Sequence, residues 1–184
     1  MFINEGRFHY DFTTDFDNAM PLITVFILPY ILRYPFWFLV YVFVGKYTNQ
    51  SHIEKILLID AISKLICGII YVIVPTTNMR PELEISGICD FMTSFIWSCD
   101  SPPTNLFPAL HCEASMICIL STIGIDAIKP SSKAFIWMFS IIIFLSTQFT
   151  KQHYIIDLIG GIAIPLLVYF IIKAFENRGK DFTG

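Results

Sequence analysis

Two residues near the C-terminal end of the chain could act together on an electrophile. In the stretch TKQHYIIDLIGG, which spans residues 150–161, His153 and Asp157 lie four positions apart at the start of an apolar run. Residues at this spacing are neighbours on one face of an α-helix. The carboxylate can then accept a hydrogen bond from one imidazole nitrogen, which fixes the tautomer and leaves the other nitrogen free to attack. The pair predicts a nucleophilic histidine with an orienting aspartate.

A second histidine opens another apolar run. In FPALHCEAS, residues 107–115, His111 is expected in the first turn of a helix that is capped by Thr104 or Asn105, because Pro108 is tolerated that early in a helix. Backbone N–H groups at a helix start have no intrahelical acceptor and favour a bound anion. His111 is therefore a candidate general acid beside an anion site.

Two cations are expected at the same level of the structure as the two histidines. Arg80 precedes a proline in the connection before the third apolar run, and Lys151 comes two residues before His153. Together these side chains would form a phosphate pocket. One histidine would attack phosphorus and the other would protonate the leaving oxygen.

Other interpretations of the same residues remain open at this stage. A histidine at a helix start is often an interfacial residue, and Arg80 could extend from a loop end toward water. The His153 and Asp157 pair could be a structural hydrogen bond. It could also join His111 in a metal site with two histidines and one carboxylate, although two nearby cations would oppose a metal ion.

The composition is that of an integral membrane protein. Of the 184 residues, 55% are hydrophobic and only 15% are charged, against about 25% charged residues in ordinary soluble domains. The net charge of −3 gives no reason to expect nucleic-acid binding. The acidic first twenty residues lack the basic region and cleavage site of a secretory signal, so the first membrane helix is expected to direct insertion itself.

A membrane-spanning helix needs about 20 mainly apolar residues. Five spans are predicted, over residues 20–44, 55–75, 108–128, 133–149 and 153–174. The mixed segment 82–98 is expected as a short helix outside the bilayer core. The fold class is therefore all-α and integral to the membrane, with residues 1–184 forming a single domain.

The basic residues of the short connections predict the orientation, because cytoplasmic loops are rich in lysine and arginine. One side of the membrane would carry seven of them: Lys46, Lys55, Lys129, Lys133, Lys173, Arg178 and Lys180. The other side would carry three: Arg7, Arg80 and Lys151. We expect the N-terminus outside, the C-terminus in the cytoplasm, and both histidines at the outer face of what we expect to be the plasma membrane.

Arg33, Asp60 and Lys64 are charged residues inside the first two predicted spans. Asp60 and Lys64 are four residues apart, which favours an intrahelical ion pair over an ion or proton path. Arg33 lies in the middle of the first span and is expected to face the bundle and bind a carbonyl or a carboxylate. A contact between Arg33 and a lipid head group is the alternative.

Other side chains near the site leave alternatives open. Glu113 could pair with Arg80 or Lys151. Cys89 and Cys99 could form a disulfide if they flank a loop outside the cytoplasm. The pair Gly160 and Gly161 is expected to serve close helix packing.

The residues resemble the three motifs of the type 2 phosphatidic acid phosphatase superfamily, which read K-x6-R-P, P-S-G-H and S-R-x5-H-x3-D. The matching stretches are RP at 80–81, PALH at 108–111 and STQFTKQHYIID at 146–157, and the motif-bearing core covers about residues 64–165. The lysine before the histidine and the HY pair also resemble the branch that contains inositol phosphorylceramide and sphingomyelin synthases.

The resemblance implies a bundle of about six membrane helices with its site at the extracytoplasmic face, and a phosphohistidine intermediate without metal or other cofactor. By this resemblance His153 is the nucleophile, Asp157 its orienting partner, His111 the acid and Arg80 a phosphate ligand. Lys151 would replace a missing motif cation. The implied substrate is a phospholipid or polyprenyl phosphate within the bilayer.

The chain departs from the motifs at several positions. The first-motif lysine would fall at Ile73, the second-motif serine and glycine at Ala109 and Leu110, and the third-motif arginine at Thr147. The phosphate pocket therefore has fewer donors than the family pattern. We expect a metal-independent lipid phosphatase. A head-group phosphotransferase, or an inactive carrier of anionic lipids, is the alternative, and the oligomeric state is not indicated.

Overall fold

The computed structural model describes residues 8–181, with side chains as far as Arg178, so Arg7 and the side chain of Lys180 lie outside the described part. Its helices are α1 (Asp15–Ala19), the short 3-10 helix η2 (Thr24–Phe26), α2 (Ile27–Tyr47), α3 (Gln50–Ile73), α4 (Ile88–Cys99), α5 (Leu110–Ser121), α6 (Pro130–Phe149) and α7 (Ile155–Asp181). Two short parallel strands, β1 (Tyr10–Asp11) and β2 (Thr76–Thr77), complete the described chain.

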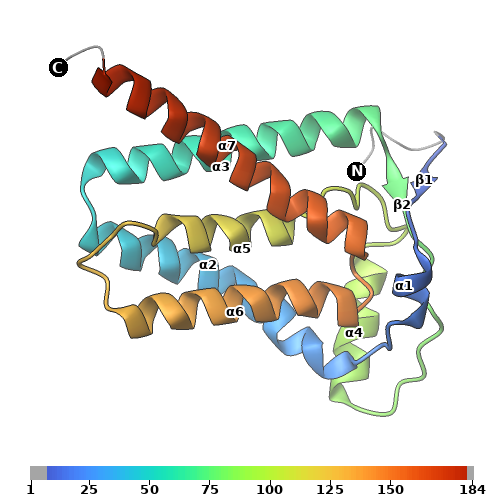
Figure 1. Ribbon diagram of the computed structural model, residues 1–184. Helices are drawn as coiled ribbons and strands as arrows, with labels where there is room; N and C mark the ends of the chain where they lie inside the picture. Colours follow the sequence, from blue (N-terminus) through green and yellow to red (C-terminus); the bar gives the residue numbers. More distant parts are fainter. Residues whose placement is uncertain (1–7, 182–184) are drawn as a thin grey trace.

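Helices α2, α3, α6 and α7 run along one bundle with α5 in the middle (Figure 1). Helix α5 packs against α2, α3, α6 and α7. Eight of its twelve residues are buried, including Cys112, Met116, Ile117 and Leu120. The core therefore surrounds α5, and the four helices around α5 fix the position of the residues at its start.

Four helical segments are long and apolar enough to cross a membrane: Thr24–Tyr47, Gln50–Ile73, Pro130–Phe149 and Ile155–Arg178. Their outward side chains are apolar and highly exposed, for example Phe38 at 69%, Leu65 at 63% and Phe175 at 68%. Such a surface suits hydrocarbon and not water. The prediction of an all-α integral membrane protein is confirmed.

The third predicted span, residues 108–128, is shorter than expected. Helix α5 has twelve residues, which is below the length of a spanning helix. It ends because polar groups take over its last carbonyls: Ser121 Oγ donates to the Cys118 carbonyl at 2.8 Å, and His52 Nε2 lies 2.9 Å from the Ser121 carbonyl. Hydropathy alone counts apolar residues and cannot detect this stop, which leaves α5 enclosed within the bundle.

Helix α4 lies across one end of the bundle (Figure 1), where the sequence predicts a short helix. The small N-terminal elements, which the sequence analysis did not predict, lie at the same end. The backbone N–H of Tyr10 donates to the Pro75 carbonyl at 2.9 Å, and that of Asn105 donates to the Thr76 carbonyl at 2.9 Å. These bonds tie the connection before α5 to the rest of the chain.

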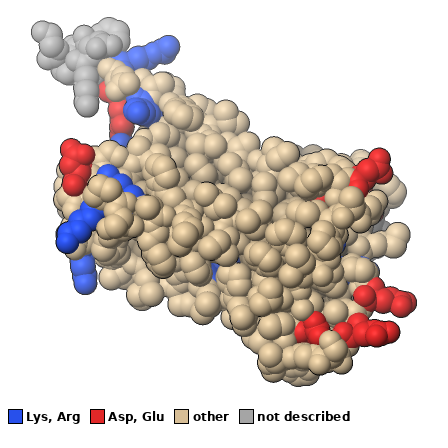
Figure 2. All heavy atoms as spheres, turned by 60° about the horizontal axis from the view of Figure 1, so that its bottom comes forward, with Lys and Arg blue, Asp and Glu red and all other residues tan. Residues whose placement is uncertain are grey.

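The two ends of the bundle differ in charge. On the face drawn in Figure 2, lysine and arginine side chains gather at the end where the C-terminus lies, and acidic side chains project from the opposite end. Lys46 stands in the last turn of α2, at the basic end. Helix α4 and the starts of α5 and α7 lie at the other end.

Candidate active site

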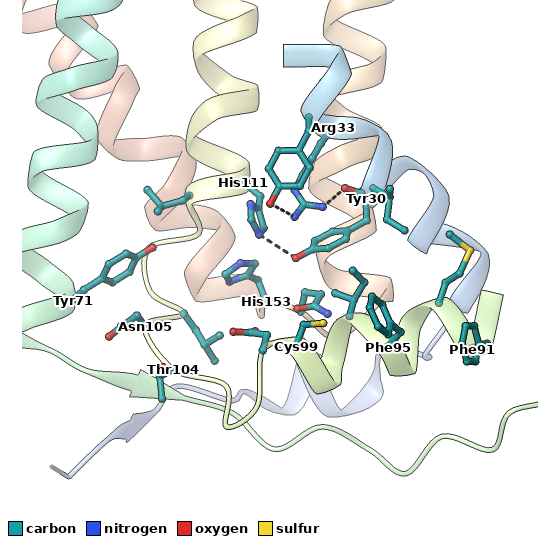
Figure 3. A pocket seen from close by; sticks show the side chains of 18 residues that line it. Tyr30, Arg33, Tyr71, Phe91, Phe95, Cys99, Thr104, Asn105, His111 and His153 are labelled. Atoms are coloured by element: carbon teal, nitrogen blue, oxygen red, sulfur yellow. Dashed lines mark hydrogen bonds between the residues drawn. The ribbon is translucent and has the colours of Figure 1, made fainter. Parts of the chain in front are cut away.

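A cavity of about 760 Å³ lies at the end of the bundle that carries α4 (Figure 3). Helices α2, α3 and α4, the start of α5 and the segments before α5 and α7 form its walls. Its polar lining residues are Tyr30, Arg33, Tyr34, Tyr71, Cys99, Asp100, Thr104, Asn105, His111, Gln152 and His153. The volume is that of a small-molecule site, and both predicted histidines face it.

His111 lies in the first turn of α5. Its Nε2 lies 3.0 Å from the Tyr30 hydroxyl, and its ring is stacked near that of Trp37 at 6.2 Å between centroids. The predicted helix cap at Thr104 or Asn105 is wrong, because α5 begins later and Ala109 is its N-cap, without a side-chain cap. The two predicted cap residues stand instead in the connection that is fastened to β2.

His153 and Asp157 meet as predicted, with Nδ1 of the imidazole 3.6 Å from Oδ2 of the carboxylate, but His153 lies two residues before α7 begins and is not part of the helix. This distance fits an ion pair and is slightly longer than a hydrogen bond. The same carboxylate oxygen accepts a 2.9 Å hydrogen bond from the backbone N–H of Tyr154, just before α7 begins. Asp157 therefore also caps its own helix, as in half of a capping box.

The two histidines meet although 42 positions separate them in the chain. Their ring centroids are 5.3 Å apart at an interplanar angle of 73°. Because Nδ1 of His153 faces Asp157, its Nε2 is the nitrogen that remains for chemistry. Two imidazoles at this separation can act on the two sides of one phosphoryl group, which is the geometry that acid-assisted nucleophilic attack requires.

Backbone contacts fix the separation between the two helix starts. The backbone N–H of Ala109 donates to the Asp157 carbonyl at 2.9 Å. A Cβ atom at Gly161 would come within 2.4 Å of the Ala109 carbonyl oxygen, so this close approach requires glycine. The expectation that the glycine pair serves packing is confirmed, and the packing holds His111 opposite His153.

Arg80 is held by groups beside the cavity. Its guanidinium donates to the carboxylate of Asp100 at 2.7 Å, to the carbonyls of Trp97 and Asp100, and to Gln152 Oε1 at 3.2 Å. Asp100 and Gln152 line the cavity, whereas Arg80 is not among the lining residues. Its role as a phosphate ligand stays a prediction, and Asp100 at present neutralises its charge.

Lys151 points away from the cavity. Its backbone has a positive φ of 53°, and Nζ donates to the Asp17 carbonyl at 2.5 Å, in helix α1. Burial lowers the pKa of the Lys151 ammonium below its ordinary value, although the nearby Asp17 carboxylate opposes the shift. The sequence-based role of Lys151 in phosphate binding stays a prediction, and no contact in the structure supports it.

Asp17 connects the N-terminal segment to the site. Its Oδ1 accepts a 2.8 Å hydrogen bond from the backbone N–H of Ile155, the first residue of α7. Its Oδ2 accepts from the backbone and the hydroxyl of Thr14. The carboxylate thus caps α7 from another part of the chain, a contact that no local sequence pattern indicates.

Tyr30 and Arg33 are among the cavity residues that were not assigned to the site from sequence. Tyr30 holds His111, and Arg33 lies one turn further along α2 with 5% of its surface exposed. Arg33 donates to the Tyr30 carbonyl, as expected, and to the Tyr34 hydroxyl at 3.0 Å. The signal in the sequence was an arginine inside an apolar span, flanked by tyrosines on both sides.

The motif departures have different structural settings. Ile73 is 69% exposed at the end of α3 and does not line the cavity. Thr147 is completely buried, and its hydroxyl donates to the Phe144 carbonyl at 2.8 Å. Ala109 is also completely buried at the start of α5. None of the three supplies a donor to the cavity.

Glu113 binds Lys64, a partner that the sequence analysis did not consider for it. Its Oε2 lies 3.1 Å from Lys64 Nζ, and Lys64 also contacts Asp60. The predicted ion pair within α3 is confirmed. Glu113 points away from both Arg80 and Lys151 because it stands two residues, or about 200°, around α5 from His111.

Two alternatives can be compared with the structure. The possible disulfide between Cys89 and Cys99 is wrong, because both lie on α4, ten residues apart, and both are free. Within residues 8–181, no group of three histidine, cysteine or acidic side chains is arranged to hold a metal ion.

Comparison with known proteins agrees with the three motifs. A family model described as the PAP2 superfamily matches residues 8–171, which is most of the chain and includes every residue of the candidate site. No curated protein and no solved structure matches the chain significantly. The chain belongs to the PAP2 superfamily, the type 2 phosphatidic acid phosphatases, whose members are generally phosphatases.

Proposed function

We propose that the protein hydrolyses a lipid phosphate or diphosphate through a phosphohistidine intermediate. The main support for the proposal is the close approach of His111 and His153 in the cavity, with ring centroids 5.3 Å apart and Asp157 in contact with Nδ1 of His153. This is the constellation of a nucleophile, an orienting carboxylate and a separate acid.

In the first step, Nε2 of His153 attacks phosphorus and forms an N–P bond. The bond from phosphorus to the leaving oxygen breaks, and His111 donates a proton to that oxygen, so the lipid departs as an alcohol, or as a monophosphate if the substrate is a diphosphate. In the second step His111 accepts a proton from water, which attacks the phosphohistidine. Inorganic phosphate leaves and both histidines return to their starting protonation states.

The apolar part of the cavity supports a lipid substrate. Phe91 and Phe95 of α4 line the cavity and are 55% and 57% exposed, so they are available to hydrocarbon as well as to the cavity. Ile31 of α2 also lines the cavity. A phosphate bound near the histidines would leave its acyl or prenyl chain beside these side chains.

The distribution of basic residues supports an extracytoplasmic site. Lysine and arginine side chains gather at the C-terminal end of the bundle (Figure 2), whereas the cavity lies at the end that carries α4 (Figure 1). Positive charge favours the cytoplasmic side of a membrane. We infer that the C-terminus is cytoplasmic and that the described chain begins outside, as expected for a protein of the plasma membrane.

The test is phosphate release by the full chain in detergent, with a chelator present and with phosphatidate and a polyprenyl diphosphate as substrates. We expect release by the wild type and a loss of at least about 10³-fold in His153→Gln. The matched control is His52→Gln, the same replacement at the opposite end of the bundle, where His52 binds the Ser121 carbonyl. Equal activity in His153→Gln and the wild type would rule out the proposed nucleophile.

Head-group transfer is a second candidate, and the size of the cavity favours it. A volume of about 760 Å³ exceeds what one phosphate group needs, so an alcohol acceptor could take the place of water in the second step. Addition of a ceramide or diacylglycerol acceptor to the assay distinguishes the two. A transferase would form the phosphorylated acceptor in preference to free phosphate.

A further inference from the structure

Arg33 is a buried cation in a membrane-spanning helix without an acidic partner. Only 5% of its surface is exposed, and within the described part of the chain no carboxylate lies within 4.0 Å of its guanidinium. Its Nε has no hydrogen-bond partner there either. A buried charge is costly unless something compensates it, so the placement calls for a physical reason.

Aromatic rings hold the cation but do not neutralise it. The guanidinium carbon lies 3.7 Å from the ring centroid of Tyr30, 4.2 Å from that of Tyr34 and 5.9 Å from that of Trp37. Cation–π contacts of this kind stabilise a guanidinium and fix its orientation. The positive charge itself remains, in a setting of low dielectric constant.

The same cation lies beside the catalytic histidines (Figure 3). Tyr30 links them, because its ring lies under Arg33 while its hydroxyl is 3.0 Å from His111 Nε2. Arg33 and Asp100 are the charged lining residues apart from the histidines, and Asp100 is bonded to Arg80. The cavity therefore has an anion-binding group whose charge is not yet balanced.

We infer that Arg33 binds the phosphoryl oxygens of the substrate and thereby takes over part of the work of the missing motif cations. The inference rests on the proposed function and deepens it, since it names the phosphate ligand. A guanidinium presents two parallel N–H donors, which match two phosphate oxygens. The phosphate would then lie between Arg33 and the two imidazoles, close to Tyr30.

The test is a binding measurement with the full chain in detergent, in a His153→Gln background so that the probe is not consumed. The probe is a short-chain phosphatidate, and the matched neutral probe is the diacylglycerol with the same chains. We expect Arg33→Gln to raise the Kd for phosphatidate about 10- to 100-fold and to leave the Kd for diacylglycerol unchanged. The control is Arg178→Gln, at the exposed cytoplasmic end, which should change neither.

Inorganic phosphate distinguishes the two sources of the same chemistry. If Arg33→Gln weakens the binding of inorganic phosphate as much as that of phosphatidate, Arg33 binds any phosphate. If it weakens the binding of phosphatidate alone, Arg33 binds the phosphate only when it is attached to a lipid. Unchanged phosphatidate binding in folded Arg33→Gln would overturn the inference. If Arg33→Gln does not fold, the variant Arg33→Lys replaces it, because lysine keeps the positive charge and loses the two paired N–H donors. A Kd for phosphatidate raised about threefold or more in Arg33→Lys supports the inference, and an unchanged Kd overturns it.

The inference and the proposed function can fail separately. Arg33-dependent binding by a wild type that releases no phosphate would retain the inference and reject the enzyme. If the wild type and Arg33→Gln release phosphate with the same KM and bind phosphatidate with the same Kd, the proposed enzyme is retained and the inference about Arg33 is rejected.

Discussion

Two buried ions of opposite sign lie in the interior of this bundle, and their surroundings differ. Glu113 on α5 has no exposed side-chain surface and is 3.1 Å from Lys64, which also contacts Asp60. Arg33 on α2 is also buried, with 5% of its surface exposed, but it has aromatic rings around it and no carboxylate within 4.0 Å among the described residues. The first ion is balanced within the protein and lies among packed helices, whereas the second faces a cavity of about 760 Å³.

Under the proposed function, the difference separates a structural charge from a substrate-binding one. A balanced pair inside a membrane protein needs nothing further, and removing one partner leaves a buried charge alone. An unbalanced cation beside two histidines still lacks a counter-ion, and under the proposed function the phosphate of the substrate would supply it. Both regions meet on α5, where Glu113 faces one and His111 the other.

The largest expected effect compares these two neighbours on α5. His111→Gln should lower kcat for phosphate release about 10³-fold, because the leaving oxygen loses its acid. Glu113→Gln should leave kcat within a few-fold of the wild type, because that side chain faces Lys64 and not the cavity. Steady-state phosphate release by both purified variants checks the contrast. Similar losses in the two would mean that the regions are not functionally distinct.

The second effect concerns stability and should leave substrate binding alone. Lys64→Met removes the partner of a completely buried carboxylate, and we expect the free energy of unfolding to fall by about 3 kcal/mol. The double variant Lys64→Met with Glu113→Met should recover only part of that loss, because Glu113 no longer carries a charge but Asp60 still lacks its lysine partner. Thermal unfolding in detergent measures both, and KM of the folded fraction should be unchanged. A raised KM in Lys64→Met would place Lys64 among the substrate-binding groups.

A smaller effect is expected at the link between Arg33 and His111. Tyr30→Phe keeps the ring beneath Arg33 and removes the hydroxyl that lies 3.0 Å from His111 Nε2. We expect kcat to fall about tenfold and its pH profile to shift, with little change in KM, because one hydrogen bond to the acid is lost. The dependence of kcat on pH in the variant and the wild type is the measurement. A change in KM alone would assign Tyr30 to substrate binding.

The smallest effect is a pH dependence of stability at Lys151. Burial lowers the pKa of this ammonium in the folded state, so between that pKa and about 10.4 the unfolded state binds more protons. Stability should therefore rise with pH through this window, and Lys151→Gln should lack the rise, which we expect to be on the order of 1 kcal/mol or less. Thermal unfolding of both proteins at pH 7 and pH 10 compares them. A stability difference between Lys151→Gln and the wild type that is the same at both pH values would contradict the lowered pKa of Lys151. A raised KM in Lys151→Gln would support Lys151 as a phosphate ligand.

Local patterns predicted much of the fold and the centre of the site. The four long apolar helices could be predicted because a helix that crosses the bilayer needs about 20 mainly apolar residues. His153 and Asp157 were predicted to meet because they are four positions apart, and they do meet, although His153 lies just before α7 and not in it. The meeting of His111 with His153 followed from placing both helix starts on one side of the membrane.

The parts that could not be predicted depend on contacts between distant segments. The direction of Lys151 is set by Asp17, which is 134 positions earlier in the chain. The pairing of Glu113 with Lys64 depends on which faces of α3 and α5 meet, and hydropathy does not fix the rotation of an apolar helix. Arg33 was recognised as unusual, but only the packing of α2 against α5 brings it to the cavity.

The most direct test of the central claim is to trap the phosphohistidine. The wild type, while turning over phosphatidate with chelator present, would be quenched at alkaline pH, where a phosphorylated histidine survives, and its peptides examined by mass spectrometry. We expect phosphate on His153, none on His111 or His52, and more of it in His111→Gln if that variant slows hydrolysis more than attack. Phosphate release without a phosphorylated His153 in any sample, or with phosphate on another residue, would contradict the mechanism.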